Sequence, residues 1–325
     1  MSGTPIAPTP WKPSDLPTLR AAYSDRTAAL MADLAAFAYD TRIEAKGVLQ
    51  VPPELAAFGF DKLTSFHNGM TDGWAYIAEG ADLIALSFRG TSSTKNWDPD
   101  FRVTLIHPDN TDQQLRVYEG FYRAFAKLNE GKLGIEDKMG AIKQATNGAV
   151  PIYITGHSLG GALAQIAAAV LGSDQVGACY TYGSPRVGNS YFDLWVKVPS
   201  HRVLNYADIV PQVPLRSSGS FADCISPFWR SSLHARSCHA VTLSFRAESF
   251  GARLANDPRV NSAHQSGFDP WHSGSRYCRL LRQAQLNRRG EGSIAMSVYL
   301  ITRDVPREQF TFHETKPPRS PLGSI

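Results

Sequence analysis

The five residues 156–160 constrain this chain more than any other segment. Their sequence, Gly-His-Ser-Leu-Gly, matches the pattern G-x-S-x-G, in which a serine lies on a sharp turn between a strand and a helix. The preceding residues 150–155 are apolar and β-branched, as in a buried strand, and the alanine-rich residues 161–171 predict a helix that ends at Gly172. An ordinary glycine-rich turn is the alternative interpretation. The flanking strand and helix favour a nucleophilic serine at Ser158.

The composition is that of a folded chain with a sizeable core. Of 325 residues, 43% are hydrophobic and 19% are charged, so the chain can bury a full core, and its length fits one large domain or two small ones. We expect a proline-rich arm over 1–22, one domain over 23–306 and a loose tail over 307–325. The formal net charge of +4 is too small to indicate nucleic-acid binding.

The terminal segments and the four cysteines bear on the location of the protein and on the state of its thiols. The first residues lack the apolar stretch of a secretory leader, so a cytoplasmic location is expected by default, with leaderless or engineered secretion left open. No apolar run is long enough to span a membrane. Cys179 and Cys278 lie in apolar patterns and are expected to be buried thiols, while Cys224 and Cys238 flank one loop and are candidates for a bridge.

Hydrophobic periodicity alternates between strand and helix through the middle of the chain. This alternation predicts a mostly parallel sheet covered by helices on both faces, an α/β architecture. The expected strands cover 73–79, 83–88, 151–155, 178–182 and 202–206, and the expected helices cover 24–39, 119–128 and 274–285.

A serine nucleophile needs a base, and the base needs an orienting carboxylate. In proteins with this turn the chain order is serine, acid, histidine. Asp208 follows an expected strand, where catalytic groups of such sheets gather, and His272 precedes an expected helix. His264 and His239 are weaker candidates for the base. The other acids between serine and base are less well placed; they are Asp174, Asp193 and Asp223.

The tetrahedral intermediate of acyl transfer also needs hydrogen-bond donors for its oxyanion. The backbone N–H of Leu159, directly after the serine, supplies one. The second is expected where the strand 83–88 ends, because Gly90 permits a sharp turn and Thr91 offers an N–H and a hydroxyl.

Several segments together resemble the class 3, or fungal-type, lipases of the α/β-hydrolase superfamily. The matching blocks are 87–92, 117–121, 155–163, 181–189, 205–214 and His272 with Tyr277, and the resemblance spans roughly residues 23 to 281. It implies an α/β-hydrolase fold, Ser158, Asp208 and His272 as the triad, and Thr91 and Leu159 at the oxyanion hole. It also implies hydrolysis of acylglycerol esters without a metal or other cofactor.

The resemblance places the start of a lid at Asn96, Trp97 and Asp100. Pro99 and two acidic residues leave this lid little apolar surface, so we expect a short lid and weak interfacial activation. An apparent insertion over 217–238 carries several aromatic residues. It is either a flap that contacts lipid or, more simply, a loop that packs its own aromatics on the body.

The expected function is that of a lipase acting through an acyl-enzyme on Ser158. Phospholipase A1, short-chain carboxylesterase and feruloyl esterase activities stay open, because one sequence does not reveal pocket shape. Outside this class, an inactive lipid-binding protein and a peptidase are the rivals. The expected partners are a lipid or ester substrate and, transiently, a lipid surface, with the chain acting as a monomer.

Overall fold

The computed structural model describes residues 23–68, 73–90, 104–130, 134–172, 176–205, 208 and 210–212, and the backbone of 238–243 and 298–303. The expected arm over 1–22, the tail over 307–325 and the helix over 274–285 therefore lie outside the described residues. The domain boundaries stay predictions.

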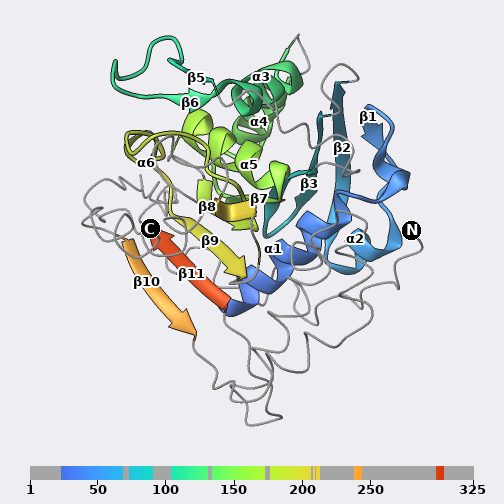
Figure 1. The fold of residues 1–325 in the computed structure, drawn as a ribbon. Helices are drawn as coiled ribbons and strands as arrows, with labels where there is room; N and C mark the ends of the chain where they lie inside the picture. The colour runs from blue at the N-terminus through green and yellow to red at the C-terminus, as the bar shows by residue number, and fades with distance from the viewer. Residues whose placement is uncertain are drawn as a thin grey trace, which may run out of the picture.

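Within the described residues, one nine-stranded sheet organises the fold, with strand order β1-β2-β3-β4-β7-β8-β9-β11-β10 (Figure 1). The four central strands, β4, β7, β8 and β9, run parallel to one another, and antiparallel strands flank them on both sides. This confirms the expected mostly parallel central sheet. The strands are β1 (Gly47–Leu49), β2 (Phe60–Asn68), β3 (Gly73–Gly80), β4 (Ile84–Phe88), β7 (Ile152–His157), β8 (Val176–Tyr182), β9 (Ser200–Asn205), β10 (Cys238–Leu243) and β11 (Val298–Arg303), with a separate ribbon of β5 (Leu105–Ile106) and β6 (Val117–Tyr118).

Helices cover both faces of the sheet, with α1 on one side and α3, α4 and α5 on the other (Figure 1). Successive side chains of a strand point to opposite faces, so Leu86 of β4 packs toward α5 whereas Ala85 packs toward α1. The helices are α1 (Asp25–Phe37), α2 (Pro53–Ala57), α3 (Glu119–Leu128), α4 (Ile135–Ala145), α5 (Leu159–Leu171) and α6 (Phe192–Trp195), with short 3-10 turns η2 (Thr41–Ile43) and η4 (Val210–Gln212).

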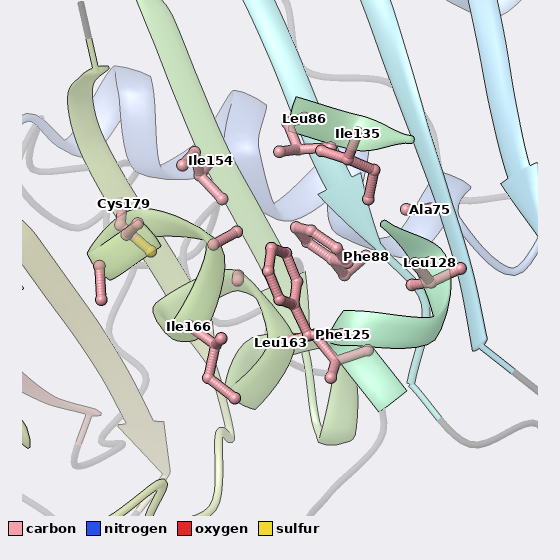
Figure 2. Close-up of a cluster of buried hydrophobic side chains, with 14 of the residues drawn as sticks. Ala75, Leu86, Phe88, Phe125, Leu128, Ile135, Ile154, Leu163, Ile166 and Cys179 are labelled. Carbon is pink, nitrogen blue, oxygen red and sulfur yellow. The ribbon is translucent and has the colours of Figure 1, made fainter. Parts of the chain in front are cut away.

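The core between the sheet and α5 combines large apolar side chains of the strands with both alanines and larger apolar side chains of the helix. Figure 2 shows Phe88 facing Phe125 of α3, with ring centroids 6.2 Å apart, and Leu163 of α5 beside them. The alanines of α5 are fully buried, which lets the helix lie close to β7 and β8. Each large apolar side chain in such a core contributes about 1.5–3 kcal/mol through burial.

The opposite face is held by hydroxyl groups as well as by apolar packing. Four hydroxyl side chains from four neighbouring strands donate to main-chain carbonyls of α1. They are Tyr76 (to Leu34, 2.7 Å), Ser87 (to Leu34, 3.1 Å), Thr155 (to Met31, 3.0 Å) and Tyr182 (to Ala28, 2.5 Å). Because these bonds come from β3, β4, β7 and β8 together, they fix where α1 crosses the sheet.

The helix expected over 24–39 is confirmed as α1, and Ser24 is its N-cap, accepting from the N–H of Thr27 at 3.3 Å. The expected helix over 119–128 is confirmed as α3, and Gly172 ends α5 as predicted, with φ of 73°. Sequence analysis missed α4, although its buried side chains recur at helical spacing. They are Ile135, Met139 and Ile142.

The junction of β7 and α5 depends on two glycines. A Cβ on Gly156 would collide with the backbone of Gly160, and a Cβ on Gly160 would collide with the carbonyl of Phe88 and come within 2.8 Å of the backbone of Arg89. Backbone atoms cannot rotate away as a flexible side chain can. The strand, the turn and the helix can therefore meet only if both positions lack a side chain.

We expect Gly160→Ala to lower the free energy of unfolding by about 3 kcal/mol, since its methyl group would force the helix away from the sheet. Gly140→Ala is the matched control, because a Cβ there meets nothing within 4 Å in the interior of α4. That variant should be more stable by about 0.5–1 kcal/mol. Urea unfolding of both variants checks this, and equal stabilities would contradict the close approach.

Candidate active site

Ser158 lies on a strained turn between β7 and α5. Its backbone has φ of 59° and ψ of −129°, a conformation that residues with a side chain rarely adopt. Strain of this kind costs on the order of 1–3 kcal/mol and persists only where surrounding contacts enforce it. Here the N–H of Ser158 donates to the carbonyl of Tyr182 at 2.9 Å, and the N–H of Gly161 donates to the carbonyl of Ser158 at 2.9 Å. The turn is therefore fixed from both sides.

The end of β4 lies directly beside this serine. A Cβ built on Gly90 would be 3.0 Å from the Cβ of Ser158 and 2.7 Å from the carbonyl oxygen of His157. Thr91, the predicted oxyanion donor, is the next residue and lies outside the described residues. The role of Thr91 therefore stays a prediction, whereas Gly90 at the end of β4 lies beside the candidate nucleophile.

Leu159 begins α5, so its backbone N–H belongs to the first turn of a 13-residue helix. The first amides of a helix have no partner within it, and the helix dipole places partial positive charge there. A negative charge that forms next to Ser158 would be stabilised by this end of the helix.

Asp208 lies just beyond the carboxyl end of β9. Its side chain is 1% exposed, and its Oδ1 accepts from the N–H of Val210 at 2.9 Å, which positions η4. Because β8 lies between the parallel strands β7 and β9, Ser158 and Asp208 follow strands that end at the same edge of the sheet. In open α/β sheets this edge is where ligands bind.

The loop after β8 braces the helix that follows the serine. Ser184 accepts from the side-chain amide of Gln165 in α5 at 2.7 Å, and its carbonyl accepts from the guanidinium of Arg202 in β9 at 2.8 Å. The loop therefore links the helix that follows the candidate nucleophile to the strand that leads to the candidate acid.

Other predicted residues fall where the structure describes no side chain. His272, the alternative base His264, Thr91 and the expected lid residues lie outside the described residues; the lid residues are Asn96, Trp97 and Asp100. His239 lies on β10, of which only the backbone is described. Asp193 lies on the short helix α6 and is exposed.

Of the four cysteines, Cys179 is a free, buried thiol as expected, and burial raises its pKa above the ordinary value. Cys224 and Cys278 lie outside the described residues, as does the side chain of Cys238. Among the described side chains, no group of three His, Cys, Asp or Glu residues is arranged to hold a metal ion. In the same part of the chain, no helix is long and apolar enough to cross a bilayer.

Sequence reasoning missed a contact behind the serine turn. The hydroxyl of Tyr39, just after α1, lies 2.9 Å from Nδ1 of His157 and also lies against the backbone of Gly90. The two side chains are 118 positions apart, so no spacing or periodicity could reveal the pair.

A central parallel sheet covered by helices on both faces, with a serine on a strained turn after β7, defines the α/β-hydrolase fold. Residues 85–218 match the family model of the class 3 lipases. A solved triacylglycerol lipase, described as having a serine protease triad at its catalytic centre, is similar in structure. It has a TM-score of 0.51 and 26% identity, covering 60% of this chain and 77% of that chain.

Two curated relatives are secreted mono- and diacylglycerol lipases. The first, from Fusarium solani, is 37% identical over 146 residues, or 43% of this chain and 42% of the relative. The second, from Penicillium cyclopium, is 32% identical over 176 residues, or 51% of this chain and 55% of the relative. The chain spans about half the length of the curated relatives it matches.

These relatives correct one expectation. The cytoplasmic location, expected only by default, is wrong, because both matched proteins are named as secreted. The expectation rested on the first residues alone and not on any property of the folded part.

The strained backbone of Ser158 lets us predict how substitutions at this position change the free energy of unfolding. Glycine tolerates φ of 59° whereas alanine keeps the Cβ that makes this conformation costly. We expect Ser158→Gly to have a free energy of unfolding about 1 kcal/mol above that of Ser158→Ala. Parallel thermal or urea unfolding measures the difference, and a more stable alanine variant would show that the turn holds no strain.

Proposed function

We propose that this protein is a serine hydrolase that cleaves carboxylic esters of acylglycerols. The observation that carries the proposal is the strained turn of Ser158, with Gly90 on one side, the N-terminus of α5 on the other and Asp208 at the same edge of the sheet. Backbone strain of this kind is commonly found at functional sites, where the surrounding contacts hold a residue in an otherwise unfavourable conformation. The family match and the triad of the similar solved lipase support the same assignment.

In the proposed reaction, the Oγ of Ser158 attacks the ester carbonyl carbon while the imidazole of His272 takes its proton. The C–O bond to the alcohol then breaks, the imidazole returns the proton to the leaving alcohol, and the acyl group stays on Ser158. Water, deprotonated by the same imidazole, hydrolyses this acyl-enzyme. Asp208 orients the imidazole and stabilises its charged form.

Each tetrahedral intermediate carries a negative oxygen, which we assign to the backbone N–H groups of Leu159 and Thr91. Loss of a single donor of this kind reduces kcat by about 10²–10³-fold in comparable sites. Proton transfer and hydrogen bonding by side chains and backbone supply all the chemistry of this scheme, so it requires no metal or other cofactor. A transient contact with a lipid surface and a monomeric state are part of the proposal.

The assignment to acylglycerols draws on the relatives, which are named mono- and diacylglycerol lipases. The chain spans only about half of their length, so the substrate is assigned through the segment that matches. The whole sequence has a formal net charge of +4, which would modestly favour binding to an anionic lipid surface.

The triad assignment predicts the response to three substitutions. Ser158→Ala, Asp208→Asn and His272→Gln should each lower kcat for tributyrin by about 10⁴-fold or more, because each removes a member of one proton-transfer unit. His264→Gln is the control and should keep wild-type activity. Inactivity of His264→Gln together with activity of His272→Gln would show that His264 is the base.

The substrate assignment predicts a ranking. Tributyrin, a long-chain diacylglycerol and a long-chain triacylglycerol should all be hydrolysed, and faster than phosphatidylcholine, a feruloyl ester or casein. A pH-stat with equal amounts of dispersed substrate measures the rates. Faster release of fatty acid from phosphatidylcholine would indicate a phospholipase A1, and activity limited to soluble short-chain esters would indicate a carboxylesterase.

A further inference from the structure

The hydroxyl of Tyr39 lies between the two chain segments that flank the candidate nucleophile. Tyr39 follows the last turn of α1, where its N–H donates to the carbonyl of Ala36 at 3.2 Å. Its hydroxyl oxygen is 2.9 Å from Nδ1 of His157, the residue before the serine. The same hydroxyl lies against the backbone of Gly90, the residue before Thr91.

Gly90 is the residue that allows this approach. A Cβ at position 90 would collide with the Tyr39 hydroxyl and would lie 3.0 Å from the Cβ of Ser158. The hydroxyl therefore occupies space that any other residue at position 90 would fill. The ring of Tyr39 meets the His157 ring at 61°, with centroids 5.9 Å apart, so packing as well as hydrogen bonding holds the pair.

The surroundings keep the phenol neutral. Burial raises the pKa of Tyr39 well above its ordinary value, and the backbone of Gly90 and the charge of Arg89 offset this only in part. A neutral phenol can accept a hydrogen bond from one neighbour while it donates to another. The hydroxyl can thus donate its proton to Nδ1 of His157 or accept one from it, depending on the tautomer of the imidazole.

Arg89 is itself held in place, so its charge is a fixed part of this environment. Its guanidinium pairs with Glu44 at 3.0 Å and lies over the ring of Trp74, 4.9 Å from the centroid. Its side chain is 4% exposed. The end of β4 is therefore anchored on the side of Trp74 through Arg89 and on the side of the serine through Gly90.

We propose that Tyr39 is a positioning residue for the oxyanion hole. Its hydroxyl contacts Gly90, where β4 ends, and His157, which precedes Ser158, and so holds the end of β4 beside the serine turn, from which we assign the two amide donors. This inference rests on the proposed ester hydrolase function. Since the donors act on charge that develops in the transition state, Tyr39 affects kcat and leaves substrate binding almost unchanged.

The test compares Tyr39→Phe with wild type on a soluble p-nitrophenyl ester. We expect kcat to fall about tenfold, less than the 10²–10³-fold of a lost direct donor, and KM to change less than about twofold. The inhibition constant of an alkyl boronic acid, whose serine adduct is tetrahedral and anionic, should rise by the same factor as kcat falls. A role in stability alone would change neither quantity in that way.

Tyr76→Phe is the matched control, because it too removes a buried hydroxyl that bonds near α1, here to the carbonyl of Leu34 at 2.7 Å. It should lower the midpoint of thermal unfolding to a similar extent as Tyr39→Phe and keep wild-type kcat. Full activity of Tyr39→Phe, or an equal loss in both variants, would overturn the positioning role. A wild-type protein that hydrolyses no ester would instead overturn the proposed function, and this inference with it.

Discussion

The contact between the backbones of Gly156 and Gly160 is the constraint on which the rest of the site depends. A side chain at either position would strike main-chain atoms, so only this pair lets α5 start directly against β7 and the end of β4. That close start forces Ser158 into φ of 59° and leaves the helix N-terminus beside it. The same geometry holds the candidate nucleophile on a fixed turn and places a positive electrostatic environment beside it for an oxyanion.

The sheet can hold this strained turn because helices pack firmly against both of its faces. On one side the alanine-rich face of α5 packs against β7 and β8, and on the other α1 accepts hydrogen bonds from four strands. Each such bond contributes about 1 kcal/mol net, comparable to the strain that the turn must store. Tyr39, which follows α1, connects this helix to the serine turn through its contacts with His157 and Gly90.

Local patterns predicted the elements that carry the candidate site. The apolar strand, the glycines and the alanine-rich helix around Ser158 are contiguous in the chain, and β7 and α5 appear where they were expected. The antiparallel strands β1 and β2 were missed because they are stabilised by pairing with β3, which a local pattern does not reveal. The contact of Tyr39 with His157 joins distant segments and needs the assembled sheet to be seen.

The central claim is that one hydroxyl, that of Ser158, forms the acyl-enzyme. Mass spectrometry of the protein after treatment with a fluorophosphonate tests it directly, because such a probe bonds covalently to an activated serine. We predict a single adduct on the peptide that contains Ser158, and its loss in Ser158→Ala. An adduct on another residue, or undiminished labelling of Ser158→Ala, would contradict the account.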